Sequence, residues 1–179
     1  GLECRLDDEI DVFYDIYSKS VHKLGTPVFS KNYFKILKEV FASRCEILIT
    51  EHQGKPISGV MSFYFRDEVL PYYGGGIEEA RNVKAYDFMY WDVMRRASSA
   101  GVKIFDYGRS KVDTGSYRFK KHWGFSAEAL HYEYYLVKSK QMPNLSPANP
   151  KYHYFIETWK RLPLSVTRII GPLLAKNLG

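Results

Sequence analysis

The stretch FDYGRSKVDTGSYRFKKHWGF, residues 105–125, concentrates side chains that could bind an anion. It reads as a strand that ends near Gly108 and feeds the N-terminus of a helix. Such a helix end offers unpaired N–H groups and a partial positive charge. A guanidinium can bind a phosphate or carboxylate through two parallel hydrogen bonds. We therefore expect an anion site here, formed by Arg109, Ser110, Lys111 and Arg118.

The short helix of this stretch should be held in place at its start and along one face. Asp113, Thr114 or Ser116 is expected to cap its N-terminus. Phe119 and Trp123 lie four residues apart, on one face, and are expected to anchor the helix to the sheet.

A plainer interpretation of the same residues is structural. Asp106 and Arg109 could pair with each other, and the lysines could be ordinary residues of a helix surface. Charge and spacing alone do not separate this interpretation from an anion site.

Composition limits the classes of function. The chain has 179 residues, which suits one domain with a sizeable core, and its net charge is +6. A basic protein favours anionic partners such as nucleic acid, nucleotide phosphates or anionic lipid, although a solvated surface explains the charge equally well. The 15 tyrosines and 11 phenylalanines could line a groove for an extended ligand, but a thick core is the favoured explanation.

Cysteine and histidine usage argues against a disulfide scaffold and against a metal centre. The two cysteines, Cys4 and Cys45, form no Cys-x-x-Cys pair, and none of the five histidines has a neighbour at metal-ligand spacing. We expect no metal and a reducing compartment. With no signal peptide and no apolar stretch of bilayer length, the expected location is cytoplasmic, with membrane association as a second option.

The periodicity of apolar residues predicts an α+β chain. Helices are expected around residues 10–21, 30–41, 85–100 and 117–123, and strands around 45–50, 56–65, 69–73, 102–107 and 127–137. A polar loop is expected at 77–84. The helix between the third and fourth strands implies a parallel crossover in an otherwise antiparallel sheet. This is the layout of the GNAT acyltransferase fold, in which the sheet splays open at that junction.

The chain is predicted to divide into a GNAT-like domain, residues 1–137, and a C-terminal part, residues 138–179. The latter begins with an exposed connector at 138–150, rich in proline and asparagine, and ends in an apolar-basic tail. That tail could lie on an anionic membrane or pack against the domain, and we favour packing.

The run FDYGRS…TGSYRFKKHWGF resembles the Fem family of aminoacyl and peptidyl transferases, which typically carry two GNAT domains in tandem. The resemblance extends to MYWDVMRRASSAGVKIFDYGRS and to YYGGG, and it covers most of residues 30–137. The tail WKRLPLSVTRIIGPLLAKNLG is similar to a subgroup associated with exosortase/PEP-CTERM surface-protein systems.

The resemblance implies attack of an amine on an activated aminoacyl ester, usually carried by tRNA, with a cell-envelope precursor as the acceptor. It places Phe119 and Lys120 in the channel for the acyl-donor end, where the cation could neutralise an RNA terminus or a developing oxyanion. It implies no cofactor and no obvious general base. Asp106, Glu133 and His131 are acid–base candidates by chemistry only.

The Fem resemblance is incomplete. Only one GNAT-like unit fits in 179 residues, so we expect this chain to be the C-terminal half of a two-domain protein whose N-terminal half is a partner. The acceptor also stays open, because family members linked to exosortase systems need not act on peptidoglycan.

Two other functions remain. The first is an acetyl-CoA-dependent GNAT N-acetyltransferase. Those enzymes bind pyrophosphate on an Arg/Gln-x-x-Gly-x-Gly/Ala loop, which the stretch GGGIEEARNVKAYDF does not repeat. The second is a non-catalytic GNAT-like module that binds or docks a partner.

Overall fold

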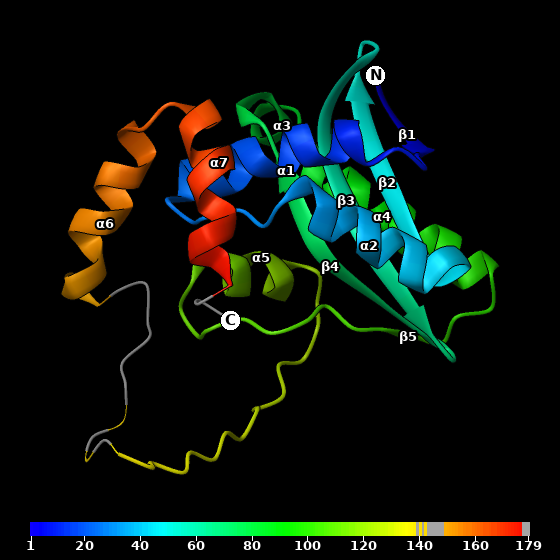
Figure 1. Cartoon of the computed structure of the whole chain (residues 1–179). Helices are drawn as coiled ribbons and strands as arrows, with labels where there is room; N and C mark the ends of the chain where they lie inside the picture. Colours follow the sequence, from blue (N-terminus) through cyan, green and yellow to red (C-terminus); the bar gives the residue numbers. More distant parts are fainter. Residues whose placement is uncertain (139, 141, 143–148, 177–179) are drawn as a thin grey trace.

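The computed structural model describes residues 1–138, 140, 142 and 149–176, and its centre is one five-stranded sheet (Figure 1). The strands follow one another in the order β1-β2-β3-β4-β5. Their bounds are Leu2–Leu6, Cys45–His52, Lys55–Phe65, Glu68–Gly76 and Ile104–Phe105. The first three junctions are antiparallel and the last, between β4 and β5, is parallel. The mixed sheet with a single parallel crossover, predicted from the sequence, is thus confirmed.

Helices cover both faces of the sheet. Their bounds are Ile10–Leu24 (α1), Lys31–Phe41 (α2), Glu78–Asn82 (α3), Ala85–Ser99 (α4), Gly115–His122 (α5), Pro150–Arg161 (α6) and Leu164–Ala175 (α7), with a 3₁₀ turn at Ala42–Arg44. In Figure 1, α1 and α2 lie in front of the sheet and α4 lies behind it. The crossover from β4 to β5 runs through α4.

Strand β2 shows how the sequence builds two cores from one sheet. Its side chains alternate between faces. Ile47 and Ile49 pack with α1 and α2, whereas Leu48 packs with Met89 and Val93 of α4. Because both faces are covered, the middle of β2, residues 47–49, reads as an unbroken apolar run rather than as an alternating one.

Several turns form as their sequence signals predict. Ser30 caps α2, and its hydroxyl accepts a hydrogen bond from the Tyr33 N–H at 3.1 Å. The hairpin between β2 and β3 turns at Gln53 and Gly54, with φ of 51° and 76°. Thr114 is the residue that caps α5, at 3.3 Å from the Tyr117 N–H.

The predicted strand over residues 127–137 is wrong. The structure has no strand there; the segment leaves α5 and runs past the sheet in an exposed, extended path (Figure 1). Its alternation of Leu130, Tyr132, Tyr134 and Leu136 is typical of a strand. A strand nevertheless needs a neighbour to satisfy its backbone groups, and within the described residues this segment has none.

Three further elements differ from the sequence-based expectation. Strand β1 was not expected; it forms because Leu2–Leu6 pairs antiparallel with the outer edge of β2. The loop expected at 77–84 contains α3, and the fifth strand is only two residues long. Most of the predicted connector at 138–150 lies outside the described residues, and α6 begins where it was to end.

The C-terminal helices lie against α1. The Arg168 guanidinium donates to the Asp15 carboxylate at 2.6 Å and to the Ser18 hydroxyl at 2.7 Å. In α6, Trp159 is buried, and the ring of His22 bonds the carbonyl of Leu162 at 2.9 Å. Within the described residues, no helix has both the length and the apolar character needed to cross a bilayer.

Gly25 is where the end of α1 meets α6, and its substitution tests that contact. Its φ is +78°, and a Cβ there would stand 2.5 Å from Cγ2 of Ile156 and 3.0 Å from the Ile156 carbonyl oxygen. Gly54 has a matching φ of +76° with open space around it. We predict that Gly54→Ala costs about 1 kcal/mol for left-handed strain. Gly25→Ala should cost roughly 1–3 kcal/mol more, because it also overpacks the α6 contact.

Urea unfolding of the two variants measures this difference. Equal losses of stability would mean that α6 does not pack on α1 at this point.

Candidate functional site

Strands β4 and β5 separate almost as soon as they pair. Only Glu68 with Ile104 and Val69 with Phe105 are in register, and the Asp106 N–H donates to the Val69 carbonyl at 2.9 Å. Beyond this point the chain of β5 leaves the sheet edge, while β4 continues to Gly76. The junction expected from the sequence is therefore present, between the second half of β4 and residues 106–110.

Aromatic rings fill the inner part of this junction. Tyr90 of α4 packs against Tyr107, with ring centroids 4.9 Å apart, and against Phe119 of α5, at 5.8 Å. On the β4 side, the Tyr90 hydroxyl lies 3.2 Å from where a Cβ of Gly74 would stand. Glycine at 74 thus allows Tyr90 to fill the space between the diverging strands. Phe119, predicted to anchor its helix, does so through these rings.

Strand β4 carries an irregularity at the same level. Met61 pairs with Tyr73 and Ser62 pairs with Pro71, so that Tyr72 has no partner on β3. A bulge of this kind redirects a side chain and is frequent beside active sites. Tyr72 is exposed. Sequence reasoning missed it; the only signal was Pro71, whose missing N–H disfavours regular pairing.

Lys120 reaches from α5 back to the end of β5. Its ammonium donates to the carbonyls of Gly108 and Arg109 at 3.2 and 3.3 Å and lies 5.6 Å from the centre of the Tyr107 ring. Burial lowers the pKa of Lys120, and the negative charge of Asp106 partly opposes this shift. The side chain is held beside the rings, with no carboxylate paired to it among the described residues.

Arg109 and Asp106 do not form the ion pair that the plainer interpretation allowed. The Asp106 carboxylate instead accepts a hydrogen bond from the Gly108 N–H at 2.7 Å, which fixes the turn after β5. Arg109 is exposed, and a hydrogen bond with the Tyr132 hydroxyl raises its pKa, with Tyr72 contributing. Arg109 therefore faces the bulged part of β4.

The other predicted anion ligands do not converge on one point. Lys111 and Arg118 are exposed, and the hydroxyl oxygen of Ser110 is buried without a partner among the described residues. The Thr114 hydroxyl caps this helix by accepting from the Tyr117 N–H, so that donor of the first turn is not free to bind an anion. A site at this junction would thus depend on the cations rather than on the helix end.

The acid–base candidates lie apart from one another. Glu133 and His131 are exposed in the extended segment, whereas Asp106 is engaged in its turn. Only Asp106 is close enough to Lys120 to affect its pKa.

A pair of phenols occupies the face of the sheet that α1 and α2 cover. The hydroxyls of Tyr33, from α2, and Tyr73, from β4, are 2.8 Å apart. Tyr73 also packs on Tyr72, with ring centroids 4.7 Å apart. Burial is the main cause of the raised pKa of Tyr73, and the hydrogen bond with Tyr33 adds to it.

The segment between β4 and α4 forms hydrogen bonds within itself. Residues Glu78–Asn82 form α3, and the N–H groups of Ala80, Val83 and Lys84 donate to carbonyls of the same segment. Ala80 and Ala85 are fully buried against Ile57. Their packing leaves no glycine loop over which a ligand could approach the backbone.

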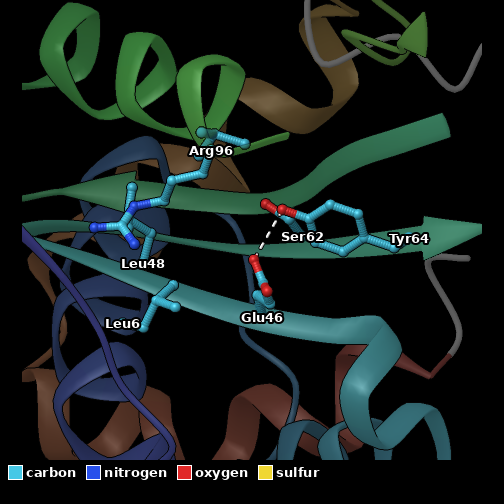
Figure 2. A pocket seen from close by; sticks show the side chains of 7 residues that line it. Leu6, Glu46, Leu48, Ser62, Tyr64 and Arg96 are labelled. Atoms are coloured by element: carbon cyan, nitrogen blue, oxygen red, sulfur yellow. Dashed lines mark hydrogen bonds between the residues drawn. The ribbon is translucent and has the colours of Figure 1, made fainter. Parts of the chain in front are cut away.

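Two cavities lie away from the junction. One, of about 10 Å³, lies between the sheet and α4 and is lined in part by Glu46, Tyr64 and Arg96 (Figure 2). It has room for a single water. The other is a surface depression of about 440 Å³ between the start of α1 and the second half of α2, near Asp8 and Lys38.

The described residues also contain no group of histidine, cysteine and acidic side chains that could hold a metal ion. Cys4 and Cys45 are both free thiols.

Comparison with known families identifies the fold. The model of the acetyltransferase (GNAT) domain matches residues 2–121, from β1 to the last turn of α5. The chain belongs to the GNAT acetyltransferase family. The matched range contains the splayed junction and the closed segment before α4. No curated protein sequence matches the chain.

Solved GNAT structures share the fold at low sequence identity. The aminoglycoside acetyltransferase meta-AAC0020, from an uncultured soil metagenomic sample, is 12% identical over 76% of this chain and 97% of its own, with a TM-score of 0.59. The ribosomal-protein-S18-alanine N-acetyltransferase of Escherichia coli is 10% identical over 72% and 80%, with a TM-score of 0.60. The aminoglycoside acetyltransferase AAC(6')-Iy, in complex with a bisubstrate analogue, is 14% identical over 78% and 99%, with a TM-score of 0.58.

The buried phenols of this GNAT domain predict a loss of stability in alkali. Burial raises the pKa of Tyr17 and of Tyr90 to about 12. Between pH 10 and 12 the unfolded chain therefore releases protons that the folded chain keeps, and each such group lowers the free energy of unfolding by about 1.4 kcal/mol per pH unit.

Urea unfolding at a series of pH values measures this slope. Tyr17→Phe should flatten it by about one proton, whereas Tyr154→Phe, at a site that is 83% exposed, should not. Equal slopes for both variants would contradict the assignment of Tyr17 as a buried phenol.

Proposed function

We propose that this GNAT domain transfers an aminoacyl or related acyl group from an activated carrier other than coenzyme A to an amine acceptor. The carrier that the Fem-like motif of residues 105–125 favours is aminoacyl-tRNA, and the acceptor it favours is a cell-envelope precursor. Membership of the GNAT family supports acyl transfer in general. The finer assignment is our inference from the residues around the junction.

The observation that carries the proposal is the closed segment between β4 and α4. An acetyl-CoA enzyme needs free N–H groups here to bind pyrophosphate. In this chain those of Ala80, Val83 and Lys84 already donate to the carbonyls of Ile77, Glu79 and Arg81. Gly76 is the last of the three glycines that end β4, and it faces Tyr86. A Cβ at position 76 would stand 2.9 Å from the Tyr86 hydroxyl. These contacts disfavour a pyrophosphate at the usual place.

The cations at the other side of the junction suit a different carrier. Arg109 is exposed and interacts with Tyr132 and Tyr72, and Lys120 lies beside the Tyr107 ring with its charge partly desolvated. In the proposed reaction the acceptor nitrogen attacks the ester carbonyl and loses a proton, the C–O bond to the carrier breaks, and the leaving carrier oxygen takes up a proton to become a hydroxyl. An ammonium placed as Lys120 is could stabilise the oxyanion that forms in between.

Coenzyme A binding separates this proposal from its closest rival. The rival is an acetyl-CoA-dependent N-acetyltransferase, and it is favoured by the solved relatives, one of which was crystallised with a CoA-containing bisubstrate analogue. We predict no heat of binding in calorimetric titration with coenzyme A at concentrations up to about 100 μM. A dissociation constant in the low micromolar range would overturn the proposal in favour of acetyl transfer.

Substitution of Lys120 tests the proposed transfer step. We predict that Lys120→Met lowers the rate of aminoacyl transfer from charged tRNA by about 10²- to 10³-fold, as expected for loss of an oxyanion partner. The matched control is Lys121→Met, which removes the same charge from the exposed side of α5. Both variants should unfold at similar urea concentrations.

Two outcomes would contradict this role of Lys120. Equal loss of rate in both variants would point to general charge attraction. A chain that binds its partner but shows no transfer with any carrier would be a docking module.

A further inference from the structure

The outer side of α7 presents an exposed apolar ridge. Val166, Ile169 and Leu173 follow one another at helical spacing and are 38%, 74% and 60% exposed. The opposite side of the helix is fully used, because Thr167, Gly171 and Ala175 are buried towards α1. A Cβ at Gly171 would stand 3.0 Å from the Val28 carbonyl oxygen, so α7 cannot turn its ridge inward.

The ridge lies in a basic part of the molecule. Residues 149–179 contain five of the 26 basic residues but only one of the 20 acidic residues, which gives +4 of the net +6. Exposed Arg161 precedes α7 and exposed Lys176 follows it, so a cation stands at each end of the ridge, whereas Lys160 is paired with Glu157. Arg168, in the middle, is already paired with Asp15.

We propose that the ridge of α7 binds the surface of an anionic lipid bilayer. An apolar stripe flanked by lysine and arginine is the pattern of a helix that lies in the membrane interface, with its apolar side chains among the acyl chains and its cations at the headgroups. A protein partner would need an apolar patch surrounded by acidic side chains, whereas an anionic bilayer supplies both features everywhere. The proposal does not depend on which acyl group the domain transfers.

In Figure 1, α7 lies on the same side of the sheet as α1, and its end points towards α5. A bilayer bound to the outer side of α7 would leave α4 and the opposite face of the sheet in water.

Vesicle co-sedimentation of the whole chain tests the proposal. We expect binding to vesicles of phosphatidylcholine with 30% phosphatidylglycerol and at least fivefold less binding to vesicles of phosphatidylcholine alone. The double variant Val166→Ser/Ile169→Ser should lose at least fivefold in bound fraction. Both positions are exposed, and an unchanged unfolding midpoint would show that the variant is folded.

Val40→Ser is the matched control, because Val40 is 65% exposed on α2, far from the cations of the tail. It should bind as the wild type does. The proposal is overturned if the wild type does not bind anionic vesicles, or if the double variant binds them as well as the control does. It is also overturned if light scattering shows a dimer that the double variant abolishes, because the ridge would then be an interface between two copies.

Discussion

The architecture of the candidate site depends on how briefly β4 and β5 stay together. Two residue pairs and the bond from the Asp106 N–H hold β5 to the sheet, and then the rings of Tyr90, Tyr107 and Phe119 take the place of further backbone pairing. Because a ring cannot satisfy backbone groups, the chain beyond Asp106 must turn. The Asp106 carboxylate stabilises that turn. The same divergence brings α5, and with it Lys120, to the edge of the sheet.

Once the strands are apart, the two sides of the junction acquire different chemistry. On the side of α4, the N–H groups of Ala80, Val83 and Lys84 are paired within the segment before α4, and Ala80 and Ala85 are buried. On the side of α5, charge is supplied by cations that no carboxylate pairs among the described residues. Under the proposed function, these side-chain cations bind the carrier in place of a backbone cradle. Such cations suit a large polyanion better than a compact pyrophosphate, because charge attraction tolerates variation in geometry.

Much of the fold follows from local sequence patterns, and the failures share a physical cause. The paired strands, the capped helices and the parallel crossover were predictable because each depends on a short-range signal, such as Ser30, Gly54 or the apolar run at Ile47–Ile49. Strand β1 and the segment 127–137 were not. Strand formation depends on a partner distant in sequence, so an alternating pattern states only that a strand would be possible. Likewise, the residues of the candidate site were found from their charge. The hydrogen bond of Arg109 with Tyr132 and the bulge at Tyr72 result from tertiary contacts.

The C-terminal helices add a constraint that the sheet alone does not impose. Arg168 donates hydrogen bonds to Asp15 and Ser18, and Gly171 lets α7 approach the backbone of Val28. These contacts determine which side of α7 faces α1. That leaves the helix only one side to present, and on that side the sequence places valine, isoleucine and leucine rather than polar residues. A helix that needed only to cover α1 would lose nothing by carrying serine or lysine there. The apolar ridge is therefore best explained by an interaction outside this chain, and the excess of positive charge around it indicates that the interacting surface is anionic.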